Sequence, residues 1–131
     1  DNYSHPVTEP QHFELQYNVW YYMLSKDEDF INAVIERYRA LRQGVLSDAY
    51  LNDYMDAVVE WLGPAVDRNF SVWGYALDKD MISPAERNPH THTEAVAQMK
   101  RFCAERGAWM DEHIDILRQY SHESRNKKFN H

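Results

Sequence analysis

The longest apolar ridge of the chain lies in the sequence AVVEWLGPAVDRNFSVW, residues 57–73. Its apolar residues follow one another at helical spacings: Val58, Leu62, Val66, Phe70 and Trp73. Residues spaced three or four apart stack along one side of an α-helix. We therefore expect this ridge to be buried and to act as the spine of the fold.

The ridge crosses Gly63 and Pro64. A proline inside a helix removes one backbone hydrogen bond and clashes with the carbonyl four residues earlier. Because the apolar period stays in phase on both sides, we expect a kink and not an end. The pattern predicts one bent helix that starts after an N-cap at Ser47 and reaches Trp73. At about 1.5 Å per residue, its roughly 26 residues would span about 40 Å.

The preceding segment has the signals of a second helix. Asp27 is a good N-cap, and acids follow it in the first turn, where the helix dipole favours negative charge. Gly44 supplies the C-terminal stop, and the short turn before Ser47 predicts an antiparallel neighbour. The expected buried stripe is Phe30, Val34, Tyr38 and Leu41, flanked by Ile31 and Ile35. The arginines of this helix, Arg37, Arg39 and Arg42, are expected to point largely outward.

Two further helices are predicted at the ends of the domain. Residues 13–24 are apolar on nearly all sides, which is typical of a helix sandwiched between other surfaces. Thr91 and Glu94 form a capping box that begins a last helix, from about His92 to about Tyr120. Its expected stripe is Val96, Met99, Cys103, Met110, Ile114 and Leu117.

The chain is therefore expected to be all-α, with about four helices, two of them long, packed as an irregular antiparallel bundle. At 131 residues it suits a single domain. We place that helical domain at residues 13–120. Pro6 and Pro10 favour extended backbone, so residues 1–12 read as a linker or extended arm. Residues 121–131 read as a flexible polar tail.

Charge and composition limit the partners. The formal net charge is −7, so the attraction to phosphates that drives non-specific nucleic-acid binding is absent overall. No apolar run approaches the roughly 20 residues of a membrane span. The single cysteine, Cys103, excludes an intramolecular disulfide. It reads as a small buried hydrophobe, with a reactive thiol as the alternative.

The residue patterns of common active sites are missing. The sequence has no HExxH, CxxC or paired ExxH pattern, so we predict no metal site. It has no GxSxG, Walker or GxGxxG motif, and its four glycines cannot build a phosphate-binding loop locally. We therefore predict no catalytic, cofactor-binding or metal-binding residue in this chain.

Arginines within apolar stripes are the anomaly of the sequence. Arg106 falls between Cys103 and Met110, so its stem should enter the core side of the last helix. In one interpretation the guanidinium reaches solvent or pairs with an acid of a helix: Asp56, Asp67 or Asp111. In the other, Arg68, Asn69 or Arg106 contacts a partner segment outside this chain.

Four motifs in order carry a family resemblance: WYYMLSKDEDF at residues 20–30, ERYRALRQGVLS at 36–47, DRNFSVW at 67–73 and MKRFCAERGAWMD at 99–111. They resemble the C-terminal helical part of the CotH-type spore-coat kinase family, over roughly residues 17–117. The departures preserve core character: Tyr38 replaces a usual Trp, and Phe102 with Cys103 stands where Trp and an aliphatic residue are common.

The resemblance implies an atypical protein kinase that uses ATP and Mg²⁺ to phosphorylate Ser in partner proteins. Its nucleotide lobe and metal-binding aspartates would precede the region matched here. This chain would then be a helical subdomain that braces the missing lobe, in a spore-coat, secreted or cell-surface protein. The candidate bracing residues are Arg68, Asn69, Trp73, Arg106, Trp109 and Asp111. The alternative is a stand-alone helical module that binds another protein.

Overall fold

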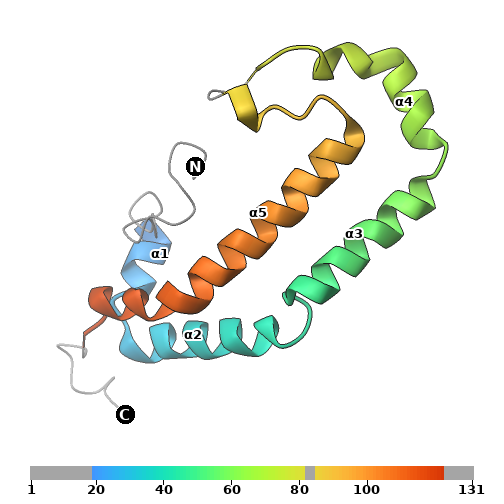
Figure 1. Cartoon of the computed structure of the whole chain (residues 1–131). Coiled ribbons are helices and arrows are strands. Elements are labelled where there is room, and N and C mark those ends of the chain that lie inside the picture. Colours follow the sequence, from blue (N-terminus) through green and yellow to red (C-terminus); the bar gives the residue numbers. More distant parts are fainter. Residues whose placement is uncertain (1–18, 82–84, 123–131) are drawn as a thin grey trace. The chain divides into compact units, whose positions relative to one another are not determined.

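The computed structural model describes residues 19–81 and 85–122, and every regular element within these ranges is helical. The α-helices are α1 (Val19–Leu24), α2 (Glu28–Arg42), α3 (Asp48–Leu62), α4 (Ala65–Trp73) and α5 (His92–His113) (Figure 1). Three 3₁₀ segments follow or precede them: η3 (Gly74–Leu77), η4 (Ala85–Arg87) and η5 (Ile114–Tyr120). The all-α prediction is confirmed.

The chain divides into two compact units. The α2–η5 unit contains residues 1–46 and 105–131, and the α3–α4 unit contains residues 47–104. Helix α5 contributes to both units, with the division at Glu105. The single domain expected over residues 13–120 stays a prediction, and the expected arm and tail lie almost wholly outside the described residues.

Side chains begin the helices where the sequence predicted. The Asp27 carboxylate accepts a hydrogen bond from the Phe30 N–H at 2.8 Å, and the Ser47 hydroxyl accepts one from the Tyr50 N–H at 3.2 Å. The Thr91 hydroxyl accepts from the Glu94 N–H at 3.1 Å. Each bond satisfies a backbone donor that has no partner within its helix. Each of these three helix starts is therefore fixed by a side chain that lies within three residues of the bonded N–H.

The predicted single kinked helix is wrong, because the chain makes two helices there. Helix α3 ends at Leu62 and α4 begins at Ala65. Gly63 lies between them with φ of 46°, and its N–H bonds to the Val59 carbonyl at 3.1 Å. Glycine reaches positive φ without the steric cost that a Cβ imposes. Gly63 therefore ends α3, and Pro64 becomes the N-cap of α4.

The hydrophobic core of the α2–η5 unit lies between α2 and η5. It comprises Ile31, Ile35, Ile114 and Leu117, each at most 5% exposed. The last helix was expected to continue to Tyr120, but it tightens to a 3₁₀ segment after His113. Residues three apart eclipse in a 3₁₀ helix, so Ile114 and Leu117 face the same side. That side packs on the two isoleucines of α2.

Two stripes that were expected to be buried are covered only in part. On α2 the two flanking isoleucines are buried, while Phe30 is 37% exposed and Val34, Tyr38 and Leu41 are half-buried. On the ridge of residues 57–73, Val58 is 36% and Trp73 55% exposed. Helical spacing produces an apolar side on a helix, but that side is buried only if another element packs against it. Val34 and Tyr38 still pack against the core from its side, whereas Phe30, Val58 and Trp73 lie at the surfaces of their units.

Candidate functional site

An arginine–carboxylate pair joins the end of α2 to the C-terminal half of α5. Nε of Arg42 lies 3.0 Å from both carboxylate oxygens of Asp111, and Nη2 lies 2.8 Å from Oδ2. Nη1 donates to the Leu46 carbonyl at 2.6 Å, in the turn after α2. The Arg42 side chain is only 13% exposed, so the expectation that it points outward is wrong. A bidentate pair of this kind fixes both distance and orientation.

Tyr38 completes the environment of Asp111. Its hydroxyl donates to Oδ1 of Asp111 at 2.8 Å and also lies 3.2 Å from the Gly107 carbonyl. The hydrogen bonds from Arg42 are the main cause that lowers the pKa of Asp111. Partial burial opposes this shift, and the hydrogen bond from Tyr38 lowers the pKa further. Asp111 is therefore an ionised carboxylate that accepts hydrogen bonds from Arg42 and Tyr38.

Gly107 lies under the Arg42 guanidinium. A Cβ built on Gly107 would stand 2.9 Å from Nη1 of Arg42 and 3.0 Å from Cζ. Real Cβ atoms do not approach other heavy atoms so closely. The glycine of the RGAWMD motif therefore makes room for the pair that the aspartate of the same motif forms.

Arg106 lies on Trp109, a residue that is 3% exposed. The Arg106 Cζ is 4.2 Å from the centre of the indole ring, a cation–π arrangement. The His113 ring also stacks on this indole, with the two ring centres 4.7 Å apart and a 9° angle between their planes. Burial lowers the pKa of Arg106 below its ordinary value.

Of the acids considered as partners of Arg106, two bind other cations. Asp111 binds Arg42, and Asp56 accepts from Lys100 at 2.5 Å. Arg39 points outward as expected, and from that exposed position it pairs with Asp115. Arg118 binds the same carboxylate at 3.2 Å.

The remaining candidates lie on α4, in the other unit. Arg68 and Asn69 are exposed, and Trp73 is 55% exposed with its ring 6.1 Å from that of Tyr75. Arg106, Trp109 and Asp111 lie in the α2–η5 unit. Neither set is tested as a brace, so that role stays a prediction for all six residues.

Sequence reasoning missed Arg42 and Tyr38 as the partners of Asp111. The only signal was that all three residues lie within two of the quoted motifs, residues 36–47 and 99–111. Spacing along one helix cannot show that Arg42 and Asp111, 69 residues apart, will meet. Tyr38, Arg42 and Asp111 of these two motifs thus form a contact between α2 and α5.

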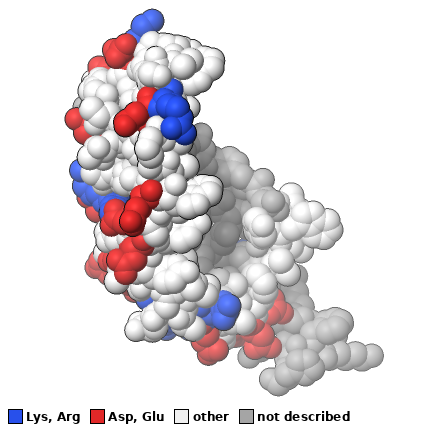
Figure 2. Space-filling model, turned by 90° about the vertical axis from the view of Figure 1, so that its right-hand side faces the viewer, with Lys and Arg blue, Asp and Glu red and all other residues white. Residues whose placement is uncertain are grey.

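Within the described ranges, His, Cys, Asp and Glu side chains form no group of three that could hold a metal ion. No described helix combines the length and apolarity needed to cross a membrane. On the face drawn in Figure 2, acidic and basic side chains are interspersed between broad uncharged areas.

Comparison with known proteins identifies the family. The sequence model described as CotH kinase protein matches residues 2–110. Searches of curated proteins and of solved structures found no match to the chain. The family match includes the Tyr38, Arg42 and Gly107 positions described above and ends one residue before Asp111. Because the match covers residues 2–110 of 131, this chain belongs to the CotH kinase protein family.

Proposed function

We propose that this chain is the C-terminal helical part of a CotH-like protein kinase and that it supports a catalytic lobe formed by other sequence. ATP and Mg²⁺ would bind in that lobe, because phosphoryl transfer needs a phosphate-binding element, metal ligands and a base for the substrate hydroxyl. This chain supplies a scaffold and no catalytic residue. A spore-coat or cell-surface location belongs to the same proposal.

The observation that carries this proposal is the surface of α1. All six of its residues are apolar or aromatic and all are exposed, from 41% for Tyr22 to 78% for Trp20. Aromatic side chains bury about 150–250 Å² each when they are covered. Exposed apolar side chains in this number on one short helix favour an interaction site. A lobe of the parent kinase is the partner that the family relationship favours.

The motif on α4 supports the same conclusion. Arg68 and Asn69 are exposed together with Val72, which is 63% exposed, and Trp73. A family motif whose residues are accessible is better explained by contact with a partner than by packing within this chain. Arginine and tryptophan are also the residue types enriched in the energetic centres of interfaces.

The Arg42–Asp111 pair supports a structural role for the acid. A general base works best when its pKa lies near the operating pH. The hydrogen bonds from Arg42 and Tyr38 move the pKa of Asp111 in the opposite direction, below its ordinary value. Asp111 is therefore suited to hold α2 against α5 and poorly suited to accept a proton from a substrate.

Nucleotide binding tests the claim that the site lies elsewhere. We expect no saturable heat when Mg·ATP is titrated into this chain in a calorimeter. Saturable binding at micromolar nucleotide would contradict the proposal.

The bracing role is tested in the parent kinase. Trp20→Ser and Met23→Ser should lower its thermal midpoint and its Ser-kinase rate together, because each change removes an apolar side chain that the lobe would cover. Val45→Ser, a change of an exposed apolar residue in the turn after α2, is the matched control. Equal behaviour of all three variants would exclude α1 as the contact surface.

A stand-alone interaction module is the second candidate, because the exposed α1 surface would equally suit another protein. The sequence of the parent gene before Asp1 discriminates between the two. A preceding lobe with acidic metal ligands and a nucleotide site supports the kinase part. A native chain that starts near Asp1 supports the module.

A further inference from the structure

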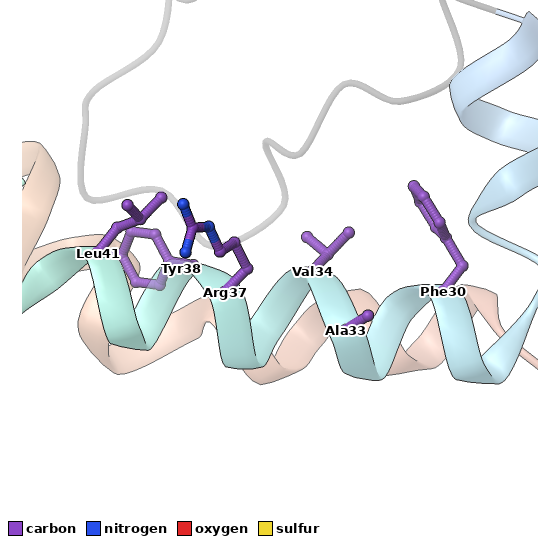
Figure 3. Close-up of a pocket in the computed structure, with 6 residues that line it drawn as sticks. All are labelled: Phe30, Ala33, Val34, Arg37, Tyr38 and Leu41. Atoms are coloured by element: carbon purple, nitrogen blue, oxygen red, sulfur yellow. The ribbon is translucent and has the colours of Figure 1, made fainter.

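A shallow apolar groove runs along α2. It has a volume of about 380 Å³ and is drawn in Figure 3. Among the residues that the structure describes, its lining consists of Phe30, Ala33, Val34, Arg37, Tyr38 and Leu41. This is the stripe that the sequence placed in the core, and it lies on α2 beside the buried Ile31 and Ile35. Val34 and Tyr38 also pack against the core, so the groove offers the accessible part of an apolar helix face that the core covers only in part.

Arg37 gives this groove a charge preference. Arg39 and Arg42 on the same helix bind acids of the C-terminal segment. Arg37 is exposed and makes no ion pair within the part of the chain that the structure describes. Its side chain extends beside Tyr38 and Leu41 in Figure 3. An apolar occupant without a carboxylate would desolvate this cation and leave it unpaired, so the groove favours an occupant that carries an acid.

Helix α3 carries a matching stripe on the other unit. Its exposed apolar residues are Tyr50, Tyr54, Val58, Trp61 and Leu62, from 36% exposed for Val58 to 83% for Trp61. From Tyr50 to Trp61 the steps are four, four and three residues, and the same steps lead from Phe30 to Leu41 in the groove. Both surfaces are about 16 Å long at about 1.5 Å per residue.

Acidic residues lie beside the α3 stripe. Asp53 and Glu60 are exposed and, among the described residues, form no ion pair, whereas Asp56 on the same helix pairs with Lys100. In an antiparallel alignment of stripe and groove, Arg37 meets Tyr54 and its neighbour Asp53. In a parallel alignment, Asp53 and Glu60 lie about one helical turn to either side of the point that Arg37 meets. Either direction provides the carboxylate.

We propose that the α2 groove of one copy of this chain binds the α3 stripe of a second copy, and that Arg37 pairs with Asp53 or Glu60 of that copy. Equal length, equal spacing and opposite charge all favour this occupant. The net charge of −7 opposes self-association, but the Debye length is only about 8 Å at physiological salt, so the short-range contact decides. The inference is independent of the proposed kinase role.

Sedimentation equilibrium of the whole chain over a concentration series tests the proposal. We expect concentration-dependent association into dimers or larger species. Arg37→Glu should weaken association at least about 10-fold, because breaking one partner of a desolvated pair is costly. The double change Asp53→Arg with Glu60→Arg should weaken it similarly, and combining it with Arg37→Glu should restore association.

Arg101→Glu is the matched control, since it makes the same charge change at an exposed position on α5. Circular dichroism of each variant checks that the helices are retained. A chain that stays monomeric at every concentration overturns the proposal, as expected if a kinase lobe or another protein occupies the groove instead. Equal effects of Arg37→Glu and Arg101→Glu, or no rescue by the charge swap, overturn it as well.

Discussion

Gly107→Ala should have opposite effects on stability depending on whether residue 42 is arginine. Glycine inside a helix costs about 0.8–1.0 kcal/mol relative to alanine, so Gly107→Ala would ordinarily stabilise α5. Here the new Cβ would stand 2.9 Å from Nη1 of Arg42. A shift costs little for the free end of a flexible side chain, but this guanidinium is held by Asp111 and by the Leu46 carbonyl, so we expect those bonds to lengthen together.

The size of the effect follows from those bonds. Hydrogen bonds to charged groups contribute about 1.5–3 kcal/mol each when buried, and much less when solvent screens them. Asp111 is 45% exposed, so we expect a loss of about 2 kcal/mol for the weakened pair, offset by about 1 kcal/mol of helix propensity. The net result in the wild-type background is a destabilisation of about 1 kcal/mol.

A double-mutant cycle with Arg42→Ala isolates this contact. In the Arg42→Ala background the obstruction is gone, so Gly107→Ala should raise the free energy of unfolding by about 1 kcal/mol. Urea unfolding followed by circular dichroism measures all four proteins. The coupling energy should be about 2 kcal/mol. If Gly107→Ala changes stability by the same amount in both backgrounds, the contact has no energetic role and the reasoning is refuted.

Two further predictions concern the core and the acid of the pair. Ile35→Ala, at a side chain that is 0% exposed, should destabilise by about 2–5 kcal/mol, whereas Val72→Ala on the exposed face of α4 should cost less than about 0.5 kcal/mol; equal losses in urea unfolding would refute the core assignment. Because the folded pKa of Asp111 is lowered from its ordinary 3.8, its contribution is fully present above that value and is lost as the pH falls through the folded pKa. The thermal midpoint of the wild type should therefore exceed that of Asp111→Asn near neutral pH and approach it in acid below about pH 4, and a gap that does not change with pH would contradict the assignment.

Local sequence signals located most of the helices. The caps at Asp27, Ser47 and Thr91 began α2, α3 and α5 where they were predicted, because a capping side chain acts on backbone donors only three residues away. The break at Gly63 was harder, since proline alone is compatible with a kink. The positive φ of the preceding glycine decided between bending and ending.

The candidate site was predicted only in part. Arg106, Trp109 and Asp111 were singled out from their positions on one helix, but the partner of Asp111 is Arg42 on α2. Arg42 stood among residues expected to face solvent, since its own helix gave it no partner. Contacts between residues far apart in sequence leave no trace in the spacing of either helix.

The sequence by itself therefore determined where the helices begin, which residues share an apolar side, and the motifs that place the chain in its family. Tertiary structure decided which apolar sides are covered. Ile31 and Ile35 are buried because η5 packs on them, while Phe30 on the neighbouring side and Val58 on the ridge of residues 57–73 stay accessible. The physical reason is that periodicity is a property of one helix, whereas burial requires a second surface.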